Sequence, residues 1–118
     1  MAVEKFGMYC IFDTVGVKVA PPFCASSQDV AVREFVIGCF GANLPPQDMQ
    51  LFRVGSFEVD YVEEDAIDEQ SGKTVFRRDL ANINIRAVDD EYEIIDVTED
   101  DIDRYFSFYQ KLRGNENG

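Results

Sequence analysis

One segment, residues 5–13 (KFGMYCIFD), constrains the fold more than any other part of the chain. As an extended strand it would be apolar on both sides, with Phe6, Met8, Cys10 and Phe12 on one side and Tyr9 and Ile11 on the other. Such a strand has no side suited to water. The pattern therefore predicts a strand in the middle of a sheet, with neighbours on both edges.

A helix is predicted over about residues 27–40. A hydroxyl of Ser26 or Ser27 can cap the free amide groups of a helix start, Asp29 suits the positive end of the helix dipole, and Gly41 is a natural stop. Between them the apolar residues recur at i, i+3, i+4, i+7 and i+8 and form one stripe: Val32, Phe35, Val36, Cys39 and Phe40.

A second helix is predicted over about residues 99–113. Thr98 can cap it, acidic residues fill its first turn, and Gly114 is expected to end it. Its apolar face contains Ile102, Tyr105, Phe106, Tyr109 and Leu112.

The remaining segments read as strands and turns. Residues 49–61 are extended, with Gly55 marking a bulge, and residues 62–72 form an exposed acidic hairpin loop. Short strands are expected at residues 17–19, 74–76, 83–85 and 92–97. The fold class is therefore α+β, an antiparallel sheet of four to five strands carrying the first helix. The C-terminal helix is expected on the same sheet or on another subunit, within a single domain spanning residues 1–118.

The composition of the chain limits the kinds of protein and of active site that it can form. The chain of 118 residues is 46% hydrophobic, which suffices for a core, and it contains no apolar run of membrane-spanning length and no signal-peptide layout. A cytoplasmic protein is expected. It has no histidine and no Gly-rich phosphate loop, and its cysteines (Cys10, Cys24 and Cys39) are odd in number and widely spaced. We expect buried free thiols, no metal, no cofactor and no enzymatic activity.

Charge suggests a first candidate surface. The net charge is −12, and nine acids without a base lie between residues 89 and 103. They are Asp89, Asp90, Glu91, Glu93, Asp96, Glu99, Asp100, Asp101 and Asp103. A solvated face with a well-capped helix explains them, and so does a partner-binding surface that mimics a nucleic-acid backbone. The ligand order of an EF-hand is missing, which argues against calcium.

Two further candidates come from basic and aromatic residues. Single-stranded DNA could contact four basic side chains that surround the ring of Phe76. These residues are Lys73, Phe76, Arg77, Arg78 and Arg86. The alternative is internal pairing with the acids of residues 63–69. Self-association could involve three residues of the last helix, Tyr105, Phe108 and Tyr109, although core packing also explains Tyr105 and Tyr109.

The first half carries motifs in a recognisable order. They are residues 8–13 (MYCIFD), 21–23 (PPF), 29–35 (DVAVREF), Pro46 with Asp48, and 51–57 (LFRVGSF). In this order they resemble the small non-structural protein of gokushoviruses, single-stranded-DNA phages of the Microviridae. The resemblance covers a core of about residues 7–61, and residues 88–118 form an acidic extension beyond it.

The resemblance implies a non-capsid role in synthesis or packaging of the single-stranded genome, and it brings no catalytic residues. The expected function is therefore a non-enzymatic phage accessory protein with a phage or host protein partner and possible contacts to single-stranded DNA. Two alternatives remain open: an acidic decoy that occupies the nucleic-acid groove of a host defence protein, and a scaffolding homo-oligomer.

Overall fold

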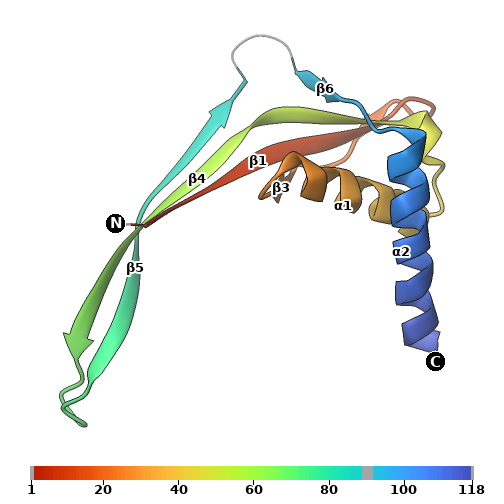
Figure 1. Cartoon of the computed structure of the whole chain (residues 1–118). Helices are drawn as coiled ribbons and strands as arrows, with labels where there is room; N and C mark the ends of the chain where they lie inside the picture. Colours follow the sequence, from red (N-terminus) through yellow and green to blue (C-terminus); the bar gives the residue numbers. More distant parts are fainter. Residues whose placement is uncertain (1, 89–91, 118) are drawn as a thin grey trace.

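The computed structural model describes residues 2–88 and 92–117 and has an α+β fold (Figure 1). Its elements in chain order are β1 (Ala2–Asp13), β2 (Lys18–Val19), β3 (Phe23–Ala25), α1 (Gln28–Gly41), η1 (Pro46–Asp48), β4 (Met49–Ile67), β5 (Thr74–Ala87), β6 (Glu93–Ile95) and α2 (Glu99–Asn117). The strands form one curled antiparallel sheet with both helices on one side of it.

The prediction that the first long strand is central is confirmed. β1 pairs with β2 and β3 along one edge and with β4 along the other, and β4 pairs in turn with β5 and β6. The sheet has six strands in the described residues, more than the four to five expected, because Phe23–Ala25 adds a short strand. The expected bulge lies beside Gly55, where the β1–β4 register shifts and a Cβ would collide with the Arg86 carbonyl.

The prediction of a loop over residues 62–72 was wrong for its first half. β4 continues to Ile67, and β5 runs unbroken through two segments that were expected as separate strands. The turn itself is short. The Asp68 carboxylate accepts hydrogen bonds from the Ser71 hydroxyl and the Gln70 N–H, which lower the pKa of that carboxyl. The far halves of these two strands and the turn between them, residues 60–79, form a long twisted ribbon, called the arm below.

The helix starts are as predicted, but one helix end is not. The Ser27 hydroxyl accepts a hydrogen bond from Val30 N–H at the start of α1. At the start of α2, Thr98 and Asp101 each accept from the backbone N–H of the other, which is a capping box. Gly114 does not end α2, which continues to Asn117, since glycine costs a helix only about 1 kcal/mol.

The core lies between α1 and one side of the sheet. It contains nine buried apolar residues, of which Phe35, Leu51 and Val36 are the largest fully buried ones. Tyr9 stacks on Phe23 at 5.8 Å between ring centroids, and burial raises the pKa of its hydroxyl. Among the described residues every buried side chain is mainly hydrocarbon, and none is charged. Burial of apolar surface therefore holds these elements together.

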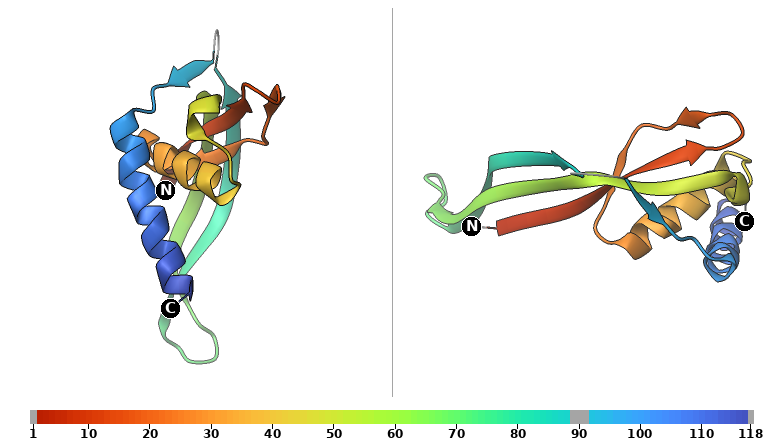
Figure 2. Two further views of the ribbon diagram at one scale, coloured as in Figure 1. Left: turned by 90° about the vertical axis from the view of Figure 1, so that its right-hand side faces the viewer. Right: turned by 90° about the horizontal axis from the view of Figure 1, so that it is seen from above.

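The second helix packs mainly on the first, whereas it was predicted to pack on the sheet or on another subunit. The Phe40 ring of α1 lies 4.6 Å from Phe106 and 6.1 Å from Tyr109, measured between centroids. This contact places α2 across the C-terminal end of α1, and the C-terminal half of α2 extends past α1 (Figures 1 and 2).

The three cysteines are free, but they are not all buried as expected. Cys39 is buried in the core, Cys10 is half-buried and Cys24 is exposed. Cys10 and Cys24 lie on the side of the sheet away from α1, where neighbouring side chains cover them incompletely.

The molecule is unusually extended for its length. Its radius of gyration is 19.2 Å, whereas a compact chain of this length has about 13.5 Å. Its accessible surface is 8483 Å², about 2,000 Å² above the roughly 6,500 Å² typical of a monomer of this mass. None of the described helices is long and apolar enough to cross a membrane.

The core makes a first prediction. Phe35→Ala should lower the free energy of unfolding by about 3–5 kcal/mol, because it leaves a cavity where the ring is 1% exposed. Phe76→Ala is the matched control, since that ring is 62% exposed and its loss should change stability by about 0.5 kcal/mol or less. Urea unfolding of both variants tests this, and equal losses would contradict the assignment of the core.

The buried thiol makes a second prediction. Burial raises the pKa of Cys39 from 9.0 to about 11. Between these pH values the unfolded chain releases the thiol proton and the folded chain retains it, so stability should fall as pH rises. Urea unfolding under reducing conditions at pH 8 and pH 10.5 should show a larger loss for the wild type than for Cys39→Ala. The same pH dependence in both proteins would contradict this.

Candidate interaction surfaces

Strand register gives the sheet two chemically different faces. The face that carries α1 contains Tyr9, Ile11 and Leu51, and we call it the helix face. The opposite face is called the open face. Its apolar residues, assigned from the cross-strand pairs and their alternation, are Phe6, Met8, Cys10, Phe12, Val19, Phe52, Val54, Phe57, Val59, Ile83, Ile85, Tyr92 and Ile94.

The open face is apolar along most of the sheet. Phe6 packs on Phe57 at 6.2 Å between centroids, and the ring of Phe52 lies between Phe12 at 6.4 Å and Tyr92 at 6.5 Å. No described helix covers it, and in the view from above neither helix lies in front of β4 (Figure 2).

Several side chains of the open face remain in water. Ile85, Ile94 and Tyr92 are 64%, 63% and 65% exposed. Two hollows of about 350 Å³ and 340 Å³ lie side by side around Cys10, Val54 and Tyr92. Sequence reasoning did not identify this surface, although the apolar alternation at residues 6–12 indicated half of it.

The five residues predicted to contact single-stranded DNA are divided between the two faces of the sheet. Phe76 and Arg78 alternate onto the open face, whereas Arg77 and Arg86 point to the other, and Lys73 is in the turn of the arm. The structure therefore does not gather them into one groove. Opposite Arg77 in the register is Glu64, and opposite Phe76 is Asp65.

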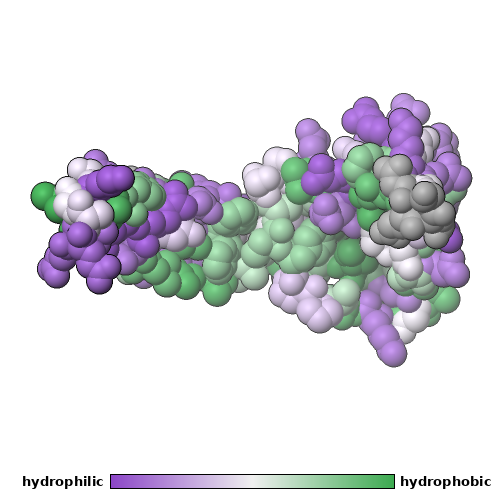
Figure 3. Space-filling model, turned by 90° about the horizontal axis from the view of Figure 1, so that it is seen from below, coloured by the Kyte–Doolittle hydropathy of each residue, from purple (hydrophilic) through white to green (hydrophobic). Residues whose placement is uncertain are grey.

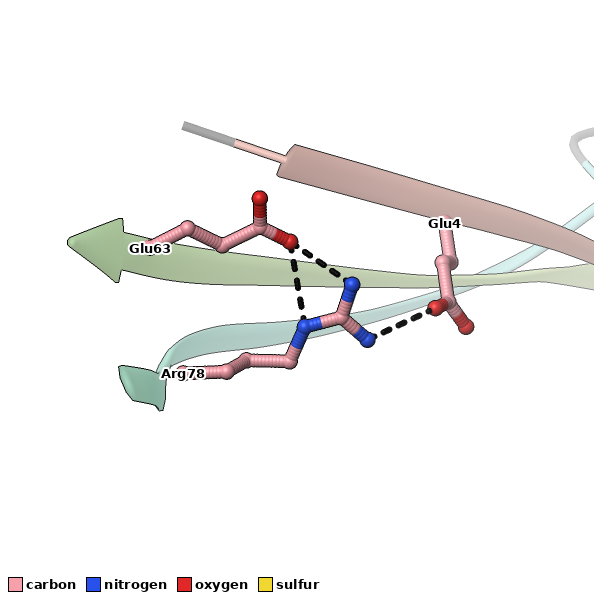
Figure 4. Close-up of polar contacts among 3 residues, drawn as sticks. All are labelled: Glu4, Glu63 and Arg78. Carbon is pink, nitrogen blue, oxygen red and sulfur yellow. Dashed lines mark hydrogen bonds and ion pairs between the residues drawn. The ribbon is translucent and has the colours of Figure 1, made fainter. Parts of the chain in front are cut away.

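Arg78 is the most constrained of these cations. Its guanidinium donates to a single oxygen of Glu63 at 3.0 and 2.7 Å, and its third nitrogen lies 3.5 Å from a Glu4 oxygen (Figure 4). Its charged carbon is 4.6 Å from the centre of the Tyr61 ring. The group ties β5 to β4 and β1, as the internal-pairing alternative expected.

The arm as a whole is acidic. Residues 60–79 contain seven acids and three bases, and hydrophilic side chains cover much of the arm in the view from below (Figure 3). This field repels a nucleic-acid backbone at long range, and it weakens the case for the arm as a DNA groove.

The predicted acidic surface is dispersed where the structure describes it. Asp89, Asp90 and Glu91 lie outside the described residues. Among the rest, Glu93 pairs with Arg53 at 3.8 Å and Asp101 is committed to the capping box. The remaining four are exposed: Asp96, Glu99, Asp100 and Asp103. In the described part of the chain no cluster of acids could hold a metal ion.

The three aromatic residues predicted for self-association differ in how far they are buried. Tyr105 and Tyr109 are partly buried against the core and α1, as the core-packing alternative expected. Phe108 is 42% exposed, and it lies about 100° around the helix from Tyr109.

Comparison with known proteins gives the family. The curled antiparallel sheet with two helices defines the class, an α+β protein. The family model described as Phage ORF5 protein matches residues 6–71, more than half of the chain, and the chain belongs to this family of phage proteins. No curated protein and no solved structure matches it. The match extends beyond the expected residues 7–61 and includes the β4 side of the arm.

The geometry of Arg78 makes a third prediction. Arg78→Ala should lower the free energy of unfolding by about 1 kcal/mol, because it removes two ion pairs and a cation–π contact at a half-exposed site. Arg77→Ala is the matched control, since Arg77 forms no ion pair within the described residues, and it should change stability by about 0.5 kcal/mol or less. Urea unfolding at low salt and in 1 M NaCl tests this, with a smaller difference expected at high salt. Equal effects of both variants would overturn the structural role of Arg78.

Proposed function

We propose that this phage protein is a non-enzymatic accessory factor that acts through protein contacts during replication or packaging of a single-stranded DNA genome. The observation that carries the proposal is the open face, an apolar surface of the kind that soluble proteins bury against another protein. Membership of the phage family and the resemblance of residues 7–61 to the gokushovirus non-structural protein supply the genomic setting.

Direct contact with DNA has a minor part in this proposal. Arg78 forms ion pairs with two carboxylates. Arg77 and Arg86 lie on the opposite face of the sheet, and Arg77 is opposite Glu64 in the acidic arm. A protein that binds single-stranded DNA along its length would instead align basic side chains and a stacking aromatic ring in one groove.

The acidic decoy is the second candidate, supported by three exposed carboxylates near the start of α2, Glu99, Asp100 and Asp103. A decoy would need these charges for its activity, whereas an accessory factor that uses apolar contacts would not. Charge neutralisation therefore separates the two functions.

The function makes a fourth prediction. A phage with a stop codon early in this gene should make double-stranded replicative DNA but at least tenfold less single-stranded progeny DNA, as measured by strand-specific hybridisation. The wild-type chain supplied from a plasmid should restore the yield. Normal yields of single-stranded DNA and particles without the protein would refute the proposed function.

Two plasmid-borne variants refine this test. Arg77→Ala/Arg86→Ala should restore the yield, because the proposed function does not require DNA contact by these groups. Failure of this variant would show that DNA contact is required. Glu99→Gln/Asp100→Asn/Asp103→Asn should also restore it, and failure in that variant alone would favour the decoy. Neither substitution touches the core or the Arg78 contacts.

A further inference from the structure

We propose that the open face is the interface of a homodimer, in which two copies pack sheet against sheet with their helices outside. This inference rests on the same surface as the proposed function and names a second copy as its occupant. The mass of the purified chain tests it separately from the yield of single-stranded DNA, so either can fail alone. The dimer proposal rests on the size of the exposed surface, on the chemistry of the open face and on the distribution of charge.

The area is what a stable dimer requires. The chain exposes about 2,000 Å² more surface than a monomer of its mass typically does. A specific interface of standard size buries about 800 Å² on each partner, and obligate dimers bury more. Covering the open face in a dimer would remove much of the excess that the extended shape creates.

The open face also has the surface of a sheet interior. Aromatic and aliphatic side chains from four paired strands alternate onto it, as they do on the inner faces of sandwich proteins. The hollows around Cys10 and Tyr92 leave room for side chains of a second sheet, which packs at about 10 Å. An isolated chain would hold Ile85 and Ile94 in water without any benefit.

Charge favours a second copy as the occupant. The net charge of −12 makes two copies repel each other over most orientations. Among the described strands, the open face between Val59 and Phe12 carries one charged side chain, Glu4, and its partner Arg78 lies beside it. Two copies can therefore approach closely through this face without opposing like charges.

Symmetry supports the same occupant. A two-fold axis through an apolar patch places that patch against its own copy on the partner, so that one surface serves as both halves of the interface. A second copy is also present at matching concentration wherever the chain is made. A different protein would need its own complementary apolar surface.

The experiment is the solution mass of the purified full chain by light scattering, at about 100 μM and neutral pH. We expect twice 13.4 kDa for the wild type. Ile85→Lys/Ile94→Lys places two desolvated charges in the interface and should give the monomer mass with an unchanged far-UV circular dichroism spectrum. Both residues are more than 60% exposed in the single chain, so the substitution leaves its core intact.

The matched control is Val62→Lys/Val75→Lys. It adds the same charge at exposed apolar positions on the other side of the arm, and it should remain a dimer. A monomeric wild type, or a dimer that survives Ile85→Lys/Ile94→Lys, would overturn the proposal. If Phe108→Ser gave the monomer mass while Ile85→Lys/Ile94→Lys remained a dimer, the interface would lie on α2 instead.

Thiol labelling provides a test without substitutions. Cys10 lies on the open face, and Cys39 lies in the core of each chain. Diluting the wild type from 100 μM to below the dissociation constant should raise the iodoacetamide labelling rate of Cys10 at least fivefold, while that of Cys39 stays constant. A Cys10 rate that is independent of concentration over four decades would contradict a dimer through this face.

Discussion

The packing of α1 onto the helix face is the interaction on which the rest of the structure depends. Phe35 and Val36 of the helix and Leu51 of β4 are the largest side chains removed from water, and both short edge strands β3 and β6 contribute a residue to the same cluster. Hydrocarbon burial of this kind is worth about 1.5–3 kcal/mol per large side chain. The arm and the far half of α2 lie outside this cluster, so their positions follow from β4 and α1 being fixed in it.

Local signals in the sequence were sufficient for the helix starts and for the central strand. Ser27 and Thr98 cap the helices as their positions indicated, because a cap is decided by three or four neighbouring residues. The length of the arm was not accessible in the same way. Acidic residues at 63–65 lower strand propensity, yet pairing of Glu63 with Arg78 across the ribbon holds them in β4. That contact joins residues fifteen apart, and spacing within one segment does not reveal it.

The candidate sites illustrate the same limit. Arg77 and Arg78 are adjacent in sequence and looked like one basic cluster, but alternation in a strand sends them to opposite faces. The open face was hidden for the converse reason. Its members come from β1, β4, β5 and β6, and only the pairing of Cys10 with Phe52 and of Phe57 with Ile85 brings them together. A surface assembled by register has no linear motif.

The acidity of the chain acquires a physical meaning once the faces are distinguished. Glu58, Asp60 and Glu64 lie on the opposite side of the sheet from the open face, and Glu99, Asp100 and Asp103 lie near the start of α2. Glu63 and Asp65 share the side of the open face only within the arm. Charge thus surrounds the apolar sheet surface and is almost absent from it. Repulsion between like-charged copies disfavours contacts through every other part of the molecule and leaves association through one face. In this reading the acids select which surface meets a partner, and the hydrophobic side chains of the open face supply the affinity.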